Sequence, residues 1–251
     1  MCCFLNYDYI THLGQVFTPQ HIFSDMLSLV RSVKREQNPR FLEPSCGNGA
    51  FWQNLQSNKV GIEIDSTALQ KLLCHTEANA EVSQNAVYLE SKRDISLCAT
   101  HRAQYEILNI DFFSYPVSEK FDTIIGNPPY VRYQDILDST KALLKPFSAI
   151  FDMRTNLYLF FIYKCVLHLK ERGELIFITP RDFLKSTASV KLNEFLFAQG
   201  SITDFVELGD KRIFDKAQPN CVIWRFEKGD FSRKVNHKRN FSCVNGQLNA
   251  N

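Results

Sequence analysis

Four consecutive residues, Asn127-Pro128-Pro129-Tyr130, combine groups that could activate an amine. The side-chain oxygen of Asn127 and the carbonyl of Pro128 are hydrogen-bond acceptors, and Tyr130 adds an aromatic ring beside them. Two acceptors that bind the hydrogens of a conjugated amine draw its lone pair out of the π-system, so that the nitrogen can attack an electrophile. The tetrapeptide therefore fits a planar substrate with an amino group. It would equally serve as a turn at the end of a strand, and the surrounding sequence must distinguish the two.

The residues before the tetrapeptide predict the strand that positions it. Ile124 and Ile125 belong to a short apolar run that is typical of a buried strand. Gly126 and the two prolines end this strand, because proline cannot donate to a sheet ladder. Each proline also fixes its own φ and restricts the preceding residue. We therefore expect a rigid loop at the carboxyl end of a strand.

A glycine-containing turn follows another predicted strand near the amino end of the chain. Residues 40–43 form the strand, and residues 44–49 read Pro-Ser-Cys-Gly-Asn-Gly before a helix predicted over 51–55. Glycine lets the backbone approach a ligand closely, and the start of a helix offers free N–H groups. The spacing is not the glycine pattern that binds a pyrophosphate, and Glu43 at the strand tip would repel phosphate. The acidic tip instead favours a cationic ligand.

Two further predicted strands end in acidic residues. Residues 59–65 form one of them, and Glu63 follows the glycine turn at close to the roughly 20-residue offset at which an acid binds ribose hydroxyls in doubly wound folds. Residues 105–111 form the other, where Asp111 could accept a hydrogen bond from an adenine amino group while Phe112 packs against the base. Each acid would otherwise be an ordinary surface charge at a strand end. The preceding glycine turn favours the ribose-binding role for Glu63.

Helices and strands are predicted to alternate along most of the chain. Thr18 is placed to cap a helix over residues 20–33 with Pro19 at its first position, and Gly173 is placed to close an apolar helix that starts after Asn156. The remaining elements are a helix over 187–198 and strands over 175–180, 202–208 and 221–226. This alternation predicts a parallel-dominated α/β sheet with functional loops at its carboxyl edge.

Several segments do not follow this alternation. Residues 75–104 are predicted to be an irregular insertion, and residues 131–155 a mobile loop above the active site. Residues 210–220 hold Phe214 among basic residues, which suits contact with a base and its flanking phosphates; Phe214 could equally anchor this loop to the core. From residue 227 onward the chain becomes basic and polar, as expected of a linker.

The composition limits the class of protein. A chain of 251 residues that is 45% apolar and 22% charged predicts a soluble globular protein with a sizeable core. The formal net charge of +2 leaves any nucleic-acid affinity to local patches. Eight cysteines without metal-site spacing are typical of reduced thiols, and no apolar run is long enough to span a membrane. We therefore expect a cytoplasmic protein without a metal site.

The order of these motifs resembles the gamma class of adenine-N6 DNA methyltransferases, which are modification enzymes of restriction systems. The motifs are Gly-Gln-Val-Phe-Thr-Pro at 14–19, Leu-Glu-Pro-Ser-Cys-Gly-Asn-Gly at 42–49, Gly-Ile-Glu-Ile-Asp at 61–65, Asn-Ile-Asp-Phe-Phe at 109–113 and Asn-Pro-Pro-Tyr at 127–130. The similarity extends over residues 14–226. It implies a Rossmann-like, seven-stranded sheet that binds S-adenosylmethionine, with six parallel strands and the last strand antiparallel. It also implies direct transfer of the methyl group to the amino group of an adenine that is flipped out of double-stranded DNA.

The resemblance also implies roles for individual residues. In the cofactor site these are Thr18, Glu43, Ser45 and Gly47 around the methionine part, Glu63 at the ribose hydroxyls, Ile64, Asp111, Phe112 and Phe161 at the adenine, and further contacts from Asn127 and Pro129. In the target-base pocket they are Asn127 and Pro128 as catalytic acceptors for the amine, Tyr130 stacked on the flipped base, and Val16 and Phe214 as walls. These roles agree with the acceptor pair, the aromatic ring and the strand-end acids described above.

Enzymes of this class usually continue with a large target-recognition domain. We expect residues 1–226 to be the catalytic domain and residues 227–251 a basic, polar linker, with target recognition on a separate chain or in a missing C-terminal domain. Methylation of a protein glutamine or of RNA is an alternative, since such enzymes can share Asn-Pro-Pro-Tyr and the cofactor. A non-catalytic half of a split methylase, which binds the cofactor or a partner subunit, is another. Residues 14–19 and the loop around Phe214 favour DNA, and the intact tetrapeptide favours catalysis.

Overall fold

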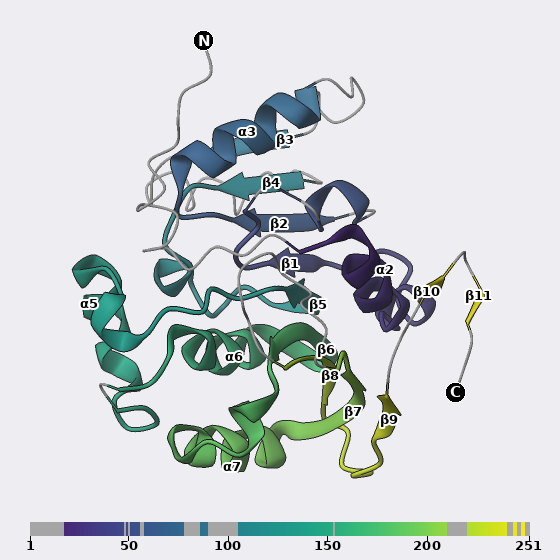
Figure 1. Cartoon of the computed structure of the whole chain (residues 1–251). Helices are drawn as coiled ribbons and strands as arrows, with labels where there is room; N and C mark the ends of the chain where they lie inside the picture. The colour runs from purple at the N-terminus through teal and green to yellow at the C-terminus, as the bar shows by residue number, and fades with distance from the viewer. Residues whose placement is uncertain are drawn as a thin grey trace.

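The computed structural model describes residues 18–47, 49, 51–55, 58–77, 86–89, 105–152, 154–209, 220–239, 243–244 and 247–248. These residues form a nine-stranded sheet with helices beside it (Figure 1). The strands of this sheet are β1 (Phe41–Glu43), β2 (Lys59–Ile62), β3 (Ala86–Leu89), β4 (Tyr105–Leu108), β5 (Phe121–Gly126), β6 (Leu169–Pro180), β7 (Gly200–Glu207), β8 (Cys221–Lys228) and β9 (Asn236–Arg239). A separate two-stranded ribbon joins β10 (Cys243–Val244) and β11 (Gln247–Leu248).

Short helices and 3-10 turns connect the strands. The α-helices are α2 (Gln20–Ser28), α3 (Ser66–Glu77), α5 (Asp138–Leu144), α6 (Leu157–His168) and α7 (Val190–Gln199). The 3-10 turns are η1 (Ser32–Lys34), η2 (Trp52–Asn54), η3 (Phe112–Ser114), η4 (Tyr133–Asp135), η5 (Lys145–Phe147), η6 (Arg181–Leu184) and η7 (Thr187–Ser189).

The order of the strands across the sheet is β3-β4-β2-β1-β5-β6-β8-β7-β9. The strands from β3 to β6 run parallel to one another. Strand β8 lies between β6 and β7 and is antiparallel to both. All seven strands predicted from the sequence are therefore present, and the last of them is the antiparallel one. Strands β3 and β9 extend this sheet at its two edges.

The two edge strands lie in segments for which the sequence predicts no strand. Strand β3 falls within the predicted insertion and pairs with β4, and β9 falls within the predicted linker and pairs with β7. The side chains of β9 are exposed, so this strand has no apolar pattern to reveal it. Polar contacts hold it instead, because Asn236 donates to Asp204 at 3.1 Å and His237 lies 3.2 Å from Glu207. The sheet thus continues beyond residue 226.

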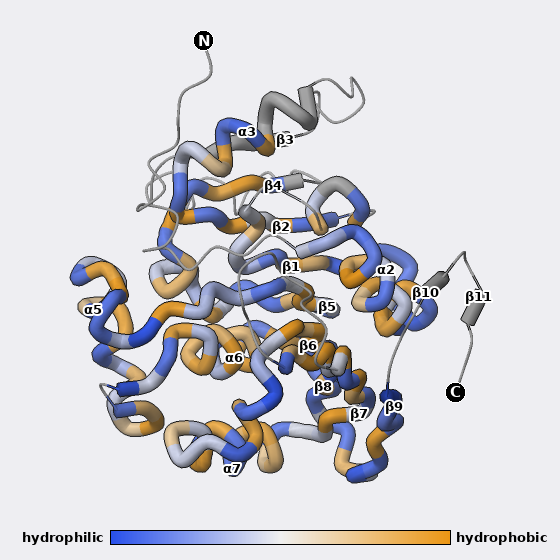
Figure 2. Tube along the Cα trace, in the orientation of Figure 1, coloured by the Kyte–Doolittle hydropathy of each residue, from blue (hydrophilic) through white to orange (hydrophobic). Residues whose placement is uncertain are grey.

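Helices cover both faces of the central strands. On one face Ile124 and Phe177 belong to an apolar cluster that includes residues of α6 and α7. On the other face Ile125 and Ile176 belong to a second cluster, which includes residues of α2. Neighbouring residues of a strand point to opposite faces, so a strand buried on both faces reads as a continuous apolar run. Figure 2 shows these runs in orange along α6 and the central strands.

Some predicted helix boundaries are wrong. Pro19, and not Thr18, occupies the N-cap of α2, and no side chain caps this helix. Helix α6 ends at His168, and Gly173 lies inside β6. A Cβ at Gly173 would lie 2.8 Å from the carbonyl oxygen of Lys170, so glycine is needed there for a close backbone approach and not for ending a helix. The helix predicted after the glycine turn is only the single turn η2.

The segment 131–155, for which the sequence predicts a mobile loop above the active site, contains α5 and two 3-10 turns. Ile136, Leu144 and Phe151 are buried and belong to the same apolar cluster as α6. The few apolar residues of this segment therefore anchor it to the core. They are too widely spaced to give a helical period, so the sequence does not predict α5.

A buried ion pair joins β6 to β8. Glu174 and Arg225 are both fully buried, and Arg225 Nε donates to Glu174 Oε2 at 2.7 Å. The other carboxylate oxygen of Glu174 accepts hydrogen bonds from the N–H groups of Arg31 and Ser32 and from the hydroxyl of Thr123. These hydrogen bonds hold residues 31 and 32, which follow α2, against β6. Such a charge is tolerated in the core because its polar atoms are paired.

Candidate active site

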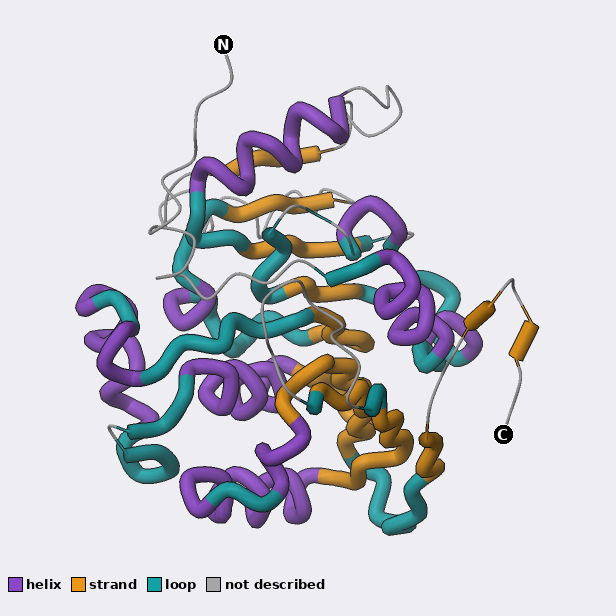
Figure 3. The backbone as a smooth tube through the Cα atoms, in the orientation of Figure 1, coloured by secondary structure: helices purple, strands orange, loops and turns teal. Residues whose placement is uncertain are grey.

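The Asn127–Tyr130 loop leaves the carboxyl edge of the sheet, where β1, β2, β4 and β5 all end because they run parallel (Figure 3). Asn127 Nδ2 donates a hydrogen bond to Thr18 Oγ1 at 3.3 Å. The Tyr130 hydroxyl lies 2.6 Å from Asn127 Oδ1 and 2.7 Å from the Ile178 carbonyl oxygen, so two acceptors share its proton. These bonds fix the direction of the Asn127 amide. An amide oxygen has two lone pairs, so it can accept from Tyr130 and from a substrate amine together.

The ring of Tyr130 is held by its surroundings. It meets Tyr158 edge to face, with ring centroids 5.7 Å apart. Burial raises the pKa of the Tyr130 phenol well above its ordinary value, and neighbouring Cys221 and Tyr158 add to the rise, so the hydroxyl is a donor at neutral pH. The N–H of Leu157 donates to the carbonyl of Val131 at 2.9 Å, which ties the end of the loop to α6. The aromatic ring predicted from the sequence therefore lies beside the predicted acceptor in a restrained loop.

The glycine turn after β1 contacts both this loop and the end of β2. Ser45 Oγ donates to the carbonyl of Asn127 at 3.2 Å. The N–H of Gly47 donates to Glu63 Oε2 at 2.7 Å. Gly47 has a φ of +53°, which glycine adopts without strain, and no described atom lies within 4 Å of the place where its Cβ would be. The turn thus leaves open space beside its backbone.

Glu63, predicted to bind the ribose hydroxyls, is buried and holds two loops together. Its carboxylate accepts the N–H of Gly47 and the N–H of Asp65, the latter at 2.9 Å. Burial raises the pKa of Glu63, and these two hydrogen bonds oppose the rise. Asn109 Nδ2 donates to the carbonyl of Glu63 at 2.8 Å, which connects the end of β4 to the same group. Ile64 exposes 38% of its surface next to Glu63, so an apolar side chain is accessible where the adenine is expected.

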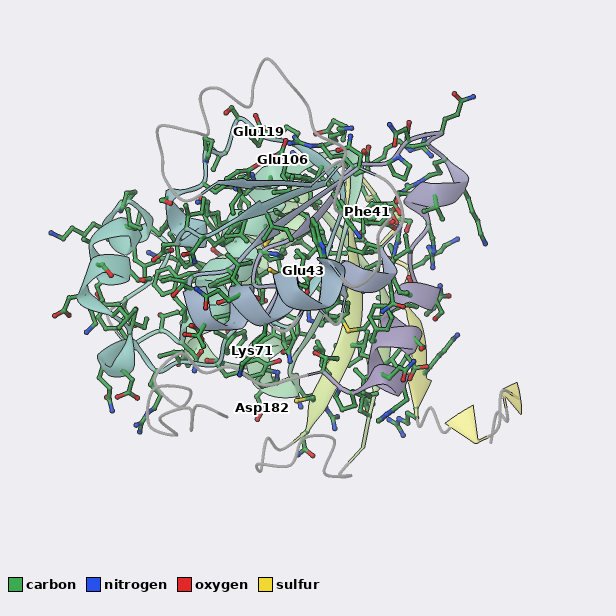
Figure 4. All side chains as sticks on the ribbon, turned by 90° about the horizontal axis from the view of Figure 1, so that it is seen from above. Phe41, Glu43, Lys71, Glu106, Glu119 and Asp182 are labelled. Carbon is green, nitrogen blue, oxygen red and sulfur yellow. The ribbon has the colours of Figure 1, made fainter. Side chains whose placement is uncertain are left out.

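Glu43, at the end of β1, is only 1% exposed, and its Oε2 atom has no hydrogen-bond partner among the described residues. Burial raises its pKa well above the ordinary value, and Glu63 adds to the rise while Lys59 opposes it. A buried polar atom without a partner costs free energy. A cationic ligand would offset this cost, as the acidic strand tip predicts. Figure 4 shows Glu43 between Glu119 and Asp182, which mark the amino and carboxyl ends of the strands.

Asp111 and two phenylalanines form the part of the site that follows β4. Asp111 Oδ1 accepts the N–H of Phe113 at 2.8 Å, and Oδ2 accepts the hydroxyl of Thr140 on α5. The rings of Phe112 and Phe161 stack with centroids 5.0 Å apart and an angle of 29° between their planes. Both rings are almost fully buried. Phe112 and Phe161 are therefore mainly core residues that support the wall on which Asp111 lies.

The other predicted site residues are placed as follows. Pro128 is buried and Pro129 half-buried within the loop that Asn127 begins. Val16 and Phe214 lie outside the described residues, so their places in the base pocket stay predictions.

Several residues of the site were not predicted from the sequence. Asn109 and Thr140 contact predicted residues directly, but a single amide or hydroxyl at a strand or helix end has no distinctive pattern. Lys59 and Lys164 are buried, and each donates hydrogen bonds to a turn that adjoins predicted site residues. Lys164 offered a signal, because it is a charge within the apolar run of α6, three positions after Phe161 on the same helix face.

The described part of the chain holds no cluster of three or more His, Cys, Asp or Glu side chains that could bind a metal ion. Nor does any helix within the described ranges have the length and apolar character needed to cross a membrane.

The chain is similar to known methylases in sequence. A family model described as Eco57I restriction-modification methylase matches residues 52–214. The type II methyltransferase M.HincII of Haemophilus influenzae is 29% identical over 228 residues, which are 89% of this chain and 39% of that protein. The type II methyltransferase M.TthHB8I of Thermus thermophilus is 30% identical over 230 residues, which are 86% of this chain and 45% of that protein. The chain thus spans less than half the length of these relatives.

Solved structures share the fold. A protein of Listeria monocytogenes described as a class I S-adenosylmethionine-dependent methyltransferase has a TM-score of 0.65 and 18% identity, over 89% of this chain and 65% of that one. The methyltransferase subunit of a type I restriction-modification system from Streptococcus thermophilus has a TM-score of 0.66 and 15% identity, over 96% of this chain and 53% of that one. The fold is therefore the class I methyltransferase fold, as the sequence motifs imply.

Proposed function

The chain belongs to the Eco57I family of restriction-modification methylases, and on that premise we propose that it is the catalytic part of a DNA adenine-N6 methyltransferase. It would take a methyl group from S-adenosylmethionine and transfer it to the amino group of an adenine flipped out of double-stranded DNA. The observation that carries the proposal is the hydrogen-bonded group of Thr18, Asn127 and Tyr130. It holds an amide oxygen and an aromatic ring side by side in one restrained loop.

The cofactor site fits a ligand that has a cationic amine, a ribose and a base. The unpartnered Oε2 of Glu43 supports a cationic group near the end of β1. The open space beside Gly47 would admit the methionine part of the cofactor. Glu63 would accept hydrogen bonds from the ribose hydroxyls, and Ile64 and Asp111 would contact the adenine. When bound, S-adenosylmethionine supplies an electrophilic methyl group.

The residues of the loop would activate and orient the amine. Asn127 Oδ1 and the carbonyl of Pro128 would accept its two hydrogens, so that charge developing on nitrogen meets acceptors already in place. The ring of Tyr130 would stack on the flipped base. Extruding a base from the duplex costs a few kcal/mol, and stacking on an aromatic side chain returns about 1–3 kcal/mol per base. Stacking on Tyr130 would therefore offset much of the cost of extrusion, and the two acceptors would orient the amine.

We also infer that residues outside this chain supply sequence-specific recognition, on a separate polypeptide or a further domain. The relatives support this inference because the chain spans 39% and 45% of their lengths. We propose residues 1–226 as the catalytic domain, and β9, which pairs with β7, adds a strand to the same sheet from beyond residue 226. An enzyme that modifies cellular DNA would act in the cytoplasm.

A methyl-transfer assay tests the proposal. The chain is incubated with labelled S-adenosylmethionine and with duplex DNA, RNA or a glutamine-containing release factor. Each incubation is done alone and together with the part of M.HincII that this chain does not cover. The modified product is digested to nucleosides and analysed by mass spectrometry. We expect N6-methyladenine from DNA and no label in RNA or protein. Label on cytosine, on RNA or on protein would refute the proposed substrate.

A further inference from the structure

Lys59 is the first residue of β2. It is 5% exposed, and its Nζ donates to the carbonyl oxygens of Trp52 at 2.5 Å and Leu55 at 2.8 Å. The ammonium group also lies 4.6 Å from the centroid of the Trp52 ring. Lys59 therefore binds both ends of the single turn η2, which follows the glycine turn along the chain.

Lys164 makes the same arrangement on α6. It is 2% exposed, and its Nζ donates to the carbonyl oxygens of Phe112 at 2.5 Å and Tyr115 at 2.8 Å. The ammonium group lies 4.8 Å from the centroid of the Phe112 ring and 5.7 Å from that of Phe113. Lys164 therefore binds both ends of η3, the turn that Asp111 begins.

A buried lysine suits both places for the same physical reason. Each turn is too short to continue as a helix, and Leu55 and Tyr115 are the residues at which the two turns end. The last carbonyls of a helix lack an N–H partner from a following turn, so a side-chain donor can satisfy them. The carbonyl of Phe112 also accepts the N–H of Tyr115 at 3.0 Å, so Lys164 is its second donor. An ammonium group has three N–H donors and no acceptor, and an aromatic face stabilises it further. The burial of each charge is thus matched by contacts with a turn of the cofactor site.

We propose that Lys59 and Lys164 are positioning residues for the two ends of the cofactor pocket. Lys59 fixes η2 and so the glycine turn that faces the methionine part, and Lys164 fixes η3 and so the Asp111 wall that faces the adenine. This inference rests on the proposed function, because it uses the cofactor orientation assigned there. Each lysine acts on the cofactor site through the backbone turn that it holds.

The electrostatic surroundings support this role. Burial lowers the pKa of Lys59 to about 8, and Glu43 on β1 opposes this shift. Burial lowers the pKa of Lys164 to about 8 as well, and Cys165 and Asp111 oppose it. Burial also lowers the pKa of His168, one turn along α6, to about 3, so this neighbour is neutral when Lys164 titrates. Each lysine therefore loses its charge, and the charge-assisted part of its hydrogen bonds, in mildly alkaline solution.

Binding of cofactor fragments separates the two roles. The wild type and the variants Lys59→Gln and Lys164→Gln are titrated with S-adenosylhomocysteine and, by competition, with adenosine. Lys164→Gln should weaken both ligands by the same factor, about tenfold or more for the loss of two charge-assisted hydrogen bonds. Lys59→Gln should weaken S-adenosylhomocysteine to a similar extent and leave adenosine unchanged. Lys170→Gln is the matched control, because Lys170 is half-exposed and pairs with Asp122 away from the site.

The proposal is overturned if either glutamine variant binds S-adenosylhomocysteine as the wild type does, or if Lys59→Gln weakens adenosine as much as Lys164→Gln does. If the wild type binds neither ligand, the proposed function itself fails. If the glutamine variants do not fold, the affinity of the wild type for adenosine is measured between pH 6.5 and 9.5. Adenosine does not titrate in this range, so a change in affinity reports on the protein. We expect adenosine affinity to fall several-fold as the pH rises through about 8. A constant affinity over this range would exclude a role for the Lys164 charge.

Discussion

The hydroxyl of Tyr130 lies 2.6 Å from the side-chain oxygen of Asn127, so the ring expected to stack on the substrate also orients the acceptor expected to bind its amine. One side chain thus has two separable roles. The ring face contributes stacking, and the hydroxyl keeps the Asn127 amide in one of its two orientations. Substitutions can remove the second role without the first.

Replacing Tyr130 by Phe should lower kcat by roughly three- to tenfold. The ring remains, but a hydrogen bond worth about 0.5–1.5 kcal/mol is lost. Tyr130→Ala should cost much more, because it also removes the stacking surface. Single-turnover methylation of a short duplex, with cofactor affinity measured in parallel, checks both. If Tyr130→Phe were as inactive as Tyr130→Ala, the phenol would take part in the chemistry and the stacking role would be wrong.

Replacing Asn127 by Ala should lower methyl transfer at least about 100-fold while cofactor affinity stays within a factor of two or three. The acceptor acts on the amine as charge develops in the transition state, and such pre-oriented groups are typically worth this much. Thr18→Val is the informative companion, because it removes a hydrogen-bond partner of Asn127 Nδ2 and keeps the acceptor oxygen, and it should cost less than tenfold at saturating cofactor. Equal losses for both variants would mean that orientation, and not the acceptor, carries the effect.

Replacing Glu63 by Ala should weaken S-adenosylmethionine binding by about 10- to 100-fold. The substitution removes a charged acceptor, worth roughly 1.5–3 kcal/mol, and also releases the N–H groups of Gly47 and Asp65. Glu119→Ala serves as the control, since Glu119 pairs with Arg40 at the amino end of the sheet. Calorimetry that shows unchanged affinity for Glu63→Ala would refute the assignment of this residue to the ribose.

Replacing Glu43 by Gln should stabilise the ligand-free protein and weaken its binding of S-adenosylmethionine. The pKa of Glu43 is raised in the folded state, so the folded protein binds a proton more readily than the unfolded chain does. Stability should therefore decrease as the pH rises above the unfolded value near 4.5 and towards the folded pKa. Melting temperatures between pH 5 and 7.5 should fall less in Glu43→Gln than in the wild type. Parallel curves for the two proteins would show that Glu43 is not the titrating group.

Methylation by residues 1–251 alone should be weak and without site preference. The exposed basic side chains of β9 can contact phosphates, and such contacts are blind to sequence and sensitive to salt. Sequencing of a plasmid methylated in vitro, at low and physiological salt, measures both properties. Efficient modification of one defined motif without any added polypeptide would locate a recognition element within this chain.

The sequence was sufficient for the elements that bury apolar side chains on a regular period. Ile124 and Ile125 predicted β5 correctly, and the same reasoning found β6, β7 and β8. It failed for β9, whose exposed polar residues are held by backbone pairing with a distant strand. It also failed at Gly173, because a glycine required by a close backbone contact has the same appearance in sequence as one that ends a helix.

The candidate site shows the same division. Order and spacing of the motifs predicted that Asn127, Glu63 and Glu43 meet at one edge of the sheet. They could not predict that Glu63 turns back onto Gly47, or that a lysine on α6 binds the carbonyl oxygens of the Asp111 turn. These contacts join residues far apart in the chain through single side chains. No local pattern records such a partner, and only the folded geometry identifies it.

The buried pair of Glu174 and Arg225 bears on the uniqueness of the fold. Strand β8 is apolar on both faces, so sliding it along β6 by one or two residues would still bury apolar side chains. In any such slipped alignment Arg225 moves at least roughly 3.3 Å along the sheet and leaves Glu174. Glu227 lies on β8 and moves with Arg225, whereas buried Glu174 loses its guanidinium partner. Removing one partner of a buried ion pair costs up to about 3–5 kcal/mol, a large part of the stability of a domain. The ion pair therefore favours a single alignment of β8, the strand that is antiparallel to both of its neighbours.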